Sequence, residues 1–460
     1  MTVEPASQTQ TSLLRQVAAN GTWWLAERFG LLGLTLITSV IVVRSLGPAA
    51  YGELSYVLAI VGLLAPLGQF GVSSLVARAL LEKPHDEAAV LRAALLMRFA
   101  GCAIAFATGL VWWTWFEGQS ADRWVVLVLL AAKFATAFQV VEFWFQVRYK
   151  AAALVPWRTG IAAVSALLKI VAAVATRDPV LVACIFAVEY LLQGAASVIA
   201  LHRAGGFWLR PGPSPEWVRW FATRTPWLLA SGIAEVIYMR IDIVFLERLR
   251  GAEEVGIYAV AAGLSEVWYM VPVVLIGAVF PALWKRRADT DAYQRGLQGS
   301  LDALFVLAFA LAVIVQIAGR PLVNLLFGPQ FAASTPVLQI HIWAGVFVFM
   351  RALLNRWLTA EDLLRFALVT QLAGAAMNVA LNILLIPTYG AVGAAIATVI
   401  SYATASWLAL FLSARTRPMG WMMAKSLLLP LRWHDVSRYA RQIAQYWSHR
   451  GPAAGSGLPR

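Results

Sequence analysis

Seven of the basic side chains inside long apolar stretches of the chain are candidate ligands for an anion: Arg28, Arg98, Lys133, Arg158, Lys169, Arg224 and Arg240. Arginine and lysine hold phosphate and carboxylate groups through charge-assisted hydrogen bonds, and the arginine fork can do so with two bonds at once. In the first half of the chain these cations outnumber the acids of the same stretches, Glu27, Glu142 and Glu189. The excess predicts a cavity that suits an anion such as a phosphate or pyrophosphate group.

The spacing of polar residues in stretch 222–247 places them on one side of a helix. Arg224, Ser231, Glu235, Tyr238 and Asp242 follow one another at intervals of 7, 4, 3 and 4 residues. At 100° per residue they fall within about 40° of one line. Three other stretches carry similar stripes: Arg28, Thr35 and Ser39; Arg158, Ser165 and Lys169; and Gln371, Asn378 and Asn382. Such stripes predict side chains that face a hydrated cavity, unless they pair with one another or reach the membrane surface.

A second group of polar residues consists of candidates for ion coupling: Glu235, Asp242, Glu266, Asn378 and Asn382. The alternative for the two asparagines is hydrogen bonding between helices. The two cysteines, Cys102 and Cys184, lie in apolar stretches and are expected to be inert packing residues. No catalytic residue, metal site or cofactor is predicted. An ion gradient could supply the energy, and the sequence does not distinguish H⁺ from Na⁺.

The elements that must position these side chains follow from composition. The chain has 460 residues, of which 60% are hydrophobic and 13% charged, and its formal net charge is +13. A soluble protein would be about a quarter charged. The basic residues are scattered between apolar stretches and form no run interleaved with aromatics, so nucleic acid is not the expected partner. The composition indicates a polytopic, all-α membrane protein.

Apolar runs bounded by charge, proline and glycine predict twelve membrane helices. Their expected limits are 24–44, 53–77, 90–116, 123–147, 151–175, 179–201, 222–247, 255–283, 297–318, 334–358, 363–387 and 390–413. The predicted organisation is an N-terminal cytoplasmic segment (1–22), a first six-helix lobe (23–201), a cytoplasmic linker (202–221), a second six-helix lobe (222–413) and a basic tail (414–460).

Alternate loops carry most of the arginine and lysine, which places both termini in the cytoplasm by the positive-inside rule. In the tail, Val436, Tyr439, Ala440, Ile443 and Trp447 share one helical face. The tail is therefore expected either to lie on the inner leaflet as an amphipathic helix or to be a solvated appendage.

An internal echo links the two predicted halves. Gly47 and Gly52 follow the first expected helix, and Gly251 and Gly256 follow the seventh with the same spacing. With six helices in each half, this echo supports a duplicated architecture of parallel repeats around a central cavity.

Three motifs in the same order resemble a known family. The turn Arg44-Ser45-Leu46-Gly47-Pro48-Ala49-Ala50-Tyr51-Gly52 is the first, Arg240-Ile241-Asp242 with Glu254-Val255-Gly256-Ile257-Tyr258 the second, and Asn378, Asn382 and Pro387-Thr388-Tyr389-Gly390 the third. They resemble those of Wzx-type polysaccharide biosynthesis proteins, the oligosaccharide flippases of the MOP superfamily. The resemblance runs over about 30–415.

The resemblance implies a two-lobed MOP/MATE-like bundle that works by alternating access and is not an enzyme. It implies transport of a polyprenyl-pyrophosphate-linked oligosaccharide across the bacterial inner membrane, for O-antigen, capsule or exopolysaccharide biosynthesis. A polysaccharide polymerase and chain-length machinery are implied as partners. The seven basic residues become candidate cavity cations, and Asp242 is the motif acid.

Two alternatives remain. A MATE-type multidrug or cation antiporter has the same plan, and Glu235, Asp242 and Glu266 would suit its cationic substrates. A membrane polysaccharide polymerase or ligase would need a large external loop, whereas no predicted external connection exceeds about fifteen residues.

Overall fold

The structure, a computed structural model, describes residues 6–117, 124–205 and 215–431, and the regular elements of these residues are all helical. The helices of the first half are α1 (Ala6–Gln69), α2 (Ser73–Glu82), α3 (Glu87–Trp112), α4 (Val125–Thr136), α5 (Val141–Val147), α6 (Ala151–Thr176) and α7 (Pro179–Arg203). Those of the second half are α8 (Pro215–Arg250), α9 (Ala252–Glu266), α10 (Met270–Lys285), α11 (Thr290–Phe327), α12 (Ser334–His341), α13 (Ala344–Ala360), α14 (Leu364–Ser406) and α15 (Arg417–Leu427).

Short segments of tighter or wider helix join some of these elements. The 3₁₀ segments are Pro84–Asp86, Ala137–Val140, Val267–Tyr269, Pro329–Phe331, Leu408–Leu412 and Leu429–Leu431. A π-helical turn, Trp113–Glu117, follows α3.

The number of membrane crossings follows from helix length and composition. Within the described residues, nine segments are long and apolar enough to cross a membrane. Two of them, 21–69 and 365–412, each hold two helices that meet at a glycine with positive φ, Gly47 and Gly390. Helix α8 has 36 residues and runs alongside the others, but its charges keep it outside the nine. The predicted all-α membrane fold with about twelve crossings is thus confirmed.

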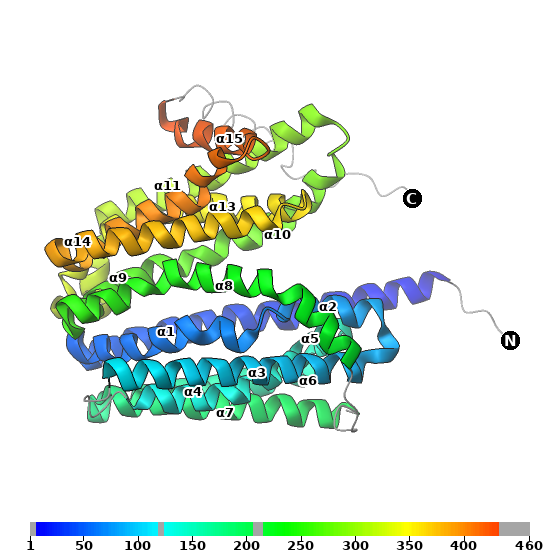
Figure 1. Cartoon of the computed structure of the whole chain (residues 1–460), viewed down its shortest axis with the longest axis horizontal. Coiled ribbons are helices and arrows are strands. Elements are labelled where there is room, and N and C mark those ends of the chain that lie inside the picture. The colour runs from blue at the N-terminus through cyan, green and yellow to red at the C-terminus, as the bar shows by residue number, and fades with distance from the viewer. Residues whose placement is uncertain (1–5, 118–123, 206–214, 432–460) are drawn as a thin grey trace, which may run out of the picture.

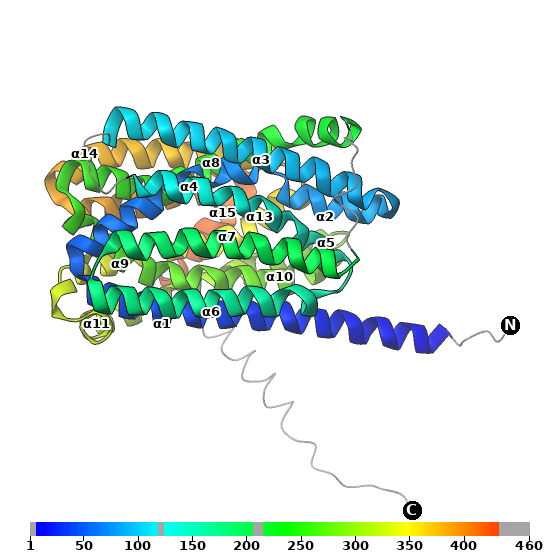
Figure 2. The ribbon, with the colours of Figure 1, turned by 90° about the horizontal axis from the view of Figure 1, so that it is seen from below.

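Consecutive crossings run antiparallel, so the turns alternate between the two ends of the bundle (Figure 1). Helices α1–α7 lie together in the lower part of Figure 1, and α9–α15 lie above them. Helix α1 packs against α8 and α9 along the boundary between the two sets. Figure 2 shows that the N-terminal turns of α1 extend beyond the other helices.

Helices extend into the three polar segments that the sequence analysis placed outside the two lobes. Helix α1 begins within the predicted segment 1–22, and α15 lies in the predicted tail. Helix α8 begins at Pro215, inside the predicted linker 202–221. Proline suits the first turn of a helix because the N–H it lacks would have no partner there, and Glu216 in the same turn favours the positive end of the helix dipole. The predicted apolar face from Val436 to Trp447 lies outside the described residues.

The echoed glycines form matching turns. Gly47 has φ 80° and ψ 175°, and Gly251 has φ 89° and ψ 176°, a region that glycine adopts without steric cost. The second glycine of each turn packs against the other turn. A Cβ on Gly52 would lie 1.7 Å from the carbonyl oxygen of Ala252, and one on Gly256 would lie 1.9 Å from that of Pro48. At this end of the bundle the two halves therefore meet through a close contact of two equivalent turns.

Polar contacts reinforce the same end of the bundle. Gln330, after α11, donates from Nε2 to the carbonyl oxygen of Arg44 at 2.9 Å. Arg250 donates to the carbonyl oxygen of Pro387 at 2.8 Å, and the Glu254 carboxylate accepts from the backbone N–H of Ala391 at 2.7 Å. These two side chains of the α8–α9 turn hold α14 at its bend.

The glycine contact is testable by adding one methyl group. We expect Gly52→Ala and Gly256→Ala each to lower the free energy of unfolding by about 1–3 kcal/mol, because the methyl forces packed backbones apart. Thermal unfolding of purified protein in detergent measures the effect. The matched controls are Gly62→Ala and Gly263→Ala on the same helices, where an added Cβ meets no atom within 4 Å. Equal unfolding midpoints for test and control variants would contradict the contact.

Candidate functional site

Polar stripes of the first half converge on one pocket. A cavity of about 440 Å³ is lined by Thr35, Thr38 and Ser39 of α1 and by Arg158 and Lys169 of α6. The predicted stripes of these two helices therefore face the same space. Tyr51, Gln139, Glu189, Tyr190 and Gln193 are among its other lining residues.

The cations of this pocket are neutralised by carboxylates. Arg158 lies 2.7 Å from a Glu142 oxygen through Nη1 and 3.2 Å from a Glu27 oxygen through Nε. Lys169 Nζ lies 2.5 Å from Glu189, which also accepts from the Ser165 hydroxyl at 2.8 Å. Each buried cation is thus compensated, as the low dielectric of this region requires.

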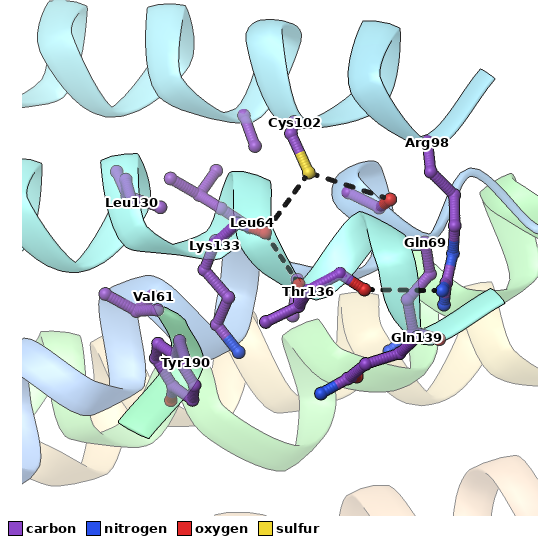
Figure 3. A pocket seen from close by; sticks show the side chains of 13 residues that line it. Val61, Leu64, Gln69, Arg98, Cys102, Leu130, Lys133, Thr136, Gln139 and Tyr190 are labelled. Carbon is purple, nitrogen blue, oxygen red and sulfur yellow. Dashed lines mark hydrogen bonds between the residues drawn. The ribbon is translucent and has the colours of Figure 1, made fainter. Parts of the chain in front are cut away.

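A neighbouring pocket holds two cations without such compensation (Figure 3). It has about 210 Å³, and Arg98 of α3 and Lys133 of α4 reach into it. Among the described residues, neither forms an ion pair. The Arg98 Nη1 makes long hydrogen bonds to the carbonyl oxygens of Thr136 and Ala137, at 3.5 and 3.4 Å. Lys133 Nζ lies 4.0 Å from the centroid of the Tyr190 ring.

The donors of this pocket suit an anion. Arg98 is 7% exposed, and its Nε is buried without a hydrogen-bond partner among the described atoms. Gln69, Thr136 and Gln139 line the same pocket and can supply further N–H or O–H groups. Gln139 and Tyr190 also line the larger pocket, so the two spaces adjoin. Sequence reasoning missed the two glutamines, because an uncharged amide in an apolar helix is a weak signal.

The remaining predicted cations lie elsewhere. Arg28 of α1 is exposed. Arg224 is also exposed and donates to the carbonyl oxygen of Trp220 on its own helix at 3.2 Å. Arg240 pairs with Glu266 at 3.0 Å. The structure therefore brings Arg98 together with Lys133, and Arg158 together with Lys169. The other three predicted cations join neither pair.

Three of the five predicted ion-coupling residues, Asp242, Asn378 and Asn382, form a buried network in the second half. The other two lie outside it: Glu235 bonds to Gln371, and Glu266 pairs with Arg240. Asp242 of α8 is fully buried and accepts hydrogen bonds from Tyr258 and Thr398 at 2.6 Å each and from Asn382 at 2.5 Å. Asn382 also donates to Asn378 at 2.9 Å. The carboxylate thereby connects α8, α9 and α14.

The stripes of α8 and α14 face each other along their length. The Ser231 hydroxyl bonds to the Gln371 amide oxygen, and the Gln371 Nε2 donates to Glu235 at 3.2 Å. With the Asp242–Asn382 bond, the stripe of the seventh crossing contacts that of the eleventh. Most polar side chains along this α8–α14 seam therefore bond to the other helix, which was the alternative to facing a hydrated cavity.

A third pocket opens beside this seam. It has about 200 Å³ and lies between α8, α10, α13 and α14. Its polar lining includes Glu235, Arg351 and Asn355, together with tyrosines of three elements, Tyr238, Tyr269 and Tyr402. Sequence reasoning missed Arg351, although a charge in the middle of an apolar stretch was the signal used elsewhere. The three tyrosines are far apart in the chain, so no local pattern joins them.

Among the described residues, no group of three or more His, Cys, Asp or Glu side chains is placed to hold a metal ion.

The Asp242 network makes a stability prediction. Tyr258→Phe removes one of three donors to a fully buried carboxylate, so we expect a loss of about 1–3 kcal/mol in the free energy of unfolding. Thermal unfolding in detergent checks it. Tyr389→Phe is the control, because the Tyr389 side chain is 58% exposed. An unchanged midpoint in Tyr258→Phe would show that this hydroxyl does not stabilise the seam.

The sequence is similar to proteins named as a glycan biosynthesis flippase and a succinoglycan biosynthesis transport protein. A probable low-salt glycan biosynthesis flippase of Haloferax volcanii is 21% identical over 210 residues, which are 44% of each chain. The succinoglycan biosynthesis transport protein ExoT of Rhizobium meliloti is 24% identical over 353 residues, 72% of this chain and 67% of that protein. The chain spans less than half the length of the first of these relatives.

Solved structures share the fold. The lipid II flippase MurJ, in an inward closed conformation, superposes with a TM-score of 0.65 at 14% identity, over 88% of this chain and 91% of that one. An inward-facing multidrug resistance MATE family transporter of the MOP superfamily gives 0.58 at 15% identity, over 86% and 96%. The chain thus shares the fold of these two proteins. The polysaccharide biosynthesis protein family matches residues 17–286, more than half of the chain, and this chain therefore belongs to that family.

Proposed function

We propose that this protein is a flippase that moves a polyprenyl-pyrophosphate-linked oligosaccharide across the membrane for surface polysaccharide biosynthesis. The observation that carries the proposal is the pocket in which Arg98 and Lys133 lie without an ion-pair partner among the described residues. Keeping positive charge without an ion-pair partner inside a membrane protein is costly, and an anionic substrate would relieve that cost each time it binds. A pyrophosphate group matches both the charge and the hydrogen-bond donors.

Alternating access of the two halves would perform the transport. The proposed moving bodies are residues 23–201 and 222–413, joined by the linker 202–221. The contact of Gly52 with Ala252 and of Gly256 with Pro48 closes one end of the bundle between them. In this mechanism that contact parts when the protein opens to the outside.

The orientation we propose follows from the basic residues. The protein is a multi-pass membrane protein, and the turns that carry Lys83, Arg148, Lys150 and Lys285 all lie at the end opposite the glycine contact. The positive-inside rule assigns that end to the cytoplasm. The proposed location is the bacterial inner membrane, with both termini cytoplasmic and the tail at the inner leaflet. A polymerase and chain-length machinery are the proposed partners.

The two alternatives receive less support. A cation antiporter needs free acids, whereas Glu266 pairs with Arg240 and Asp242 is enclosed by donors. The third candidate acid, Glu235, shares its pocket with the guanidinium of Arg351, which disfavours a cation there. A polymerase or ligase is disfavoured because the relatives described above carry the names of flippases and a transport protein.

Transport in reconstituted vesicles tests the proposal. The substrate is an undecaprenyl-pyrophosphate-linked oligosaccharide, and its accessibility in the outer leaflet is the measurement. Arg98→Gln and Lys133→Gln should each slow translocation about tenfold, because a charge-assisted hydrogen bond contributes roughly 1.5–3 kcal/mol. Lys133→Arg should retain much of the rate.

Arg295→Gln is the control for a loss of positive charge alone, since Arg295 is exposed and lies outside the three pockets. Wild-type rates in both Arg98→Gln and Lys133→Gln would remove the cationic-pocket mechanism. Efflux of a cationic dye without lipid translocation would support the antiporter instead.

The second-half network is our proposed site of ion coupling. Asp242 is its only carboxylate among the described residues, and it accepts from the hydroxyl groups of Tyr258 and Thr398 and from the amide nitrogen of Asn382. The carboxylate can bind H⁺, and together with the two hydroxyl oxygens it can bind Na⁺. We expect Asp242→Asn to abolish the dependence of transport on an imposed ion gradient, while binding of inorganic pyrophosphate at Arg98 and Lys133 persists. Gradient-dependent transport in a folded Asp242→Asn protein would exclude this role.

A further inference from the structure

The pocket of the second half differs in charge from the Arg98–Lys133 pocket. It contains one carboxylate, Glu235, and one guanidinium, Arg351, so its lining is neutral overall. No ion pair joins the two within the described part of the chain. A neutral lining is a poor match for a pyrophosphate, and the arginine makes it a poor match for an organic cation.

The two charged side chains of this pocket are held in place but keep unused hydrogen-bonding capacity. Arg351 is 6% exposed and donates to the carbonyl oxygen of Ala405 at 2.6 Å and to the Thr370 hydroxyl at 3.4 Å, which holds the guanidinium in place. Its Nε is buried without a hydrogen-bond partner among the described atoms. Glu235 accepts one hydrogen bond, from Gln371 at 3.2 Å. A carboxylate has about four acceptor positions, so most of its capacity is left for a ligand.

Tyrosine rings form the apolar wall. The rings of Tyr238 and Tyr402 meet edge to face, with centroids 5.2 Å apart, and those of Tyr269 and Tyr402 are tilted, at 6.4 Å. Each tyrosine offers an apolar face and a polar tip. Asn355 adds an amide to the lining. Because Asn355 is exposed, the pocket opens at the surface of the molecule.

A sugar ring has the complementary chemistry. Its C–H faces are apolar and pack on aromatic rings, and its hydroxyl groups both donate and accept hydrogen bonds. The volume of 200 Å³ equals roughly seven water molecules at about 30 Å³ each, which suits one ring and not an oligosaccharide.

We propose that the pocket between α8, α10, α13 and α14 binds one neutral sugar residue of the transported glycan. Glu235 and Asn355 take its hydroxyl groups, and the tyrosines take its apolar face. This inference rests on the proposed function and deepens it: the first half binds the anionic linkage and the second half selects the glycan. A substrate held by both halves would then couple its own binding to their relative movement.

Sugar binding to the intact protein tests the inference. The probes are methyl glycosides of glucose, galactose and mannose, and saturation-transfer NMR on the full chain in nanodiscs gives their affinities. We expect at least one probe to bind. Glu235→Gln and Asn355→Ala should each weaken it about tenfold, the effect of losing one hydrogen bond to a charged or well-placed group.

Lys133→Gln is the matched control in the other half. It should weaken binding of inorganic pyrophosphate and leave the glycoside affinity unchanged. Because Asn355 is exposed, Asn355→Ala gives a folded variant even where Glu235→Gln disturbs the α8–α14 seam, and the thermal midpoint of each variant verifies this.

Two outcomes would overturn the inference. The first is no glycoside binding, or binding that both variants leave intact, in a protein that still binds pyrophosphate and transports lipid-linked oligosaccharide; the proposed function would then stand without this sugar pocket. The second is binding of tetraphenylphosphonium that Glu235→Gln abolishes, which would make the pocket a cation site and remove the proposed function as well.

Discussion

The cost of placing charge in an apolar layer is the constraint on which this structure depends. Each ionised group inside a crossing needs a compensating partner, since water is not there to supply one. Arg158, Lys169 and Arg240 find carboxylates, and Asp242 finds three neutral donors. These contacts join different helices. The same interactions therefore compensate the buried charges and hold the bundle together.

Four charged groups have no ion-pair partner in the part of the chain that the structure describes. Arg98 and Lys133 share a pocket whose described lining has no carboxylate, whereas Glu235 and Arg351 share another without pairing. The first arrangement attracts an anion, and the second presents hydrogen-bonding groups without net charge. Two chemically different pockets in the two halves suit a headgroup that is anionic in one part and neutral in another.

The close contact between the halves has a different origin. Gly52 and Gly256 allow two backbones to approach more closely than any side chain permits, and the turns before them need the positive φ of Gly47 and Gly251. Arg250 and Glu254 then fasten the bend of α14 to the same end. The hydrophobic effect provides no driving force between helices in lipid. Small residues at a helix interface allow close van der Waals packing, which stabilises the contact instead.

The sequence by itself determined the fold class, the crossings and the two matching turns, because hydropathy and glycine spacing are properties of short stretches of the chain. It indicated the family through the resemblance of three motifs. It also identified the ionisable residues within the crossings. Only the tertiary structure decided which of them are neutralised: the helical stripe of α8 looked like the wall of a cavity, yet it faces the stripe of α14. The tyrosine pocket with Arg351 was likewise invisible, because its residues come from four separate helical segments. Periodicity tells which side chains share a face, but the partner of that face is set by packing between segments remote in sequence.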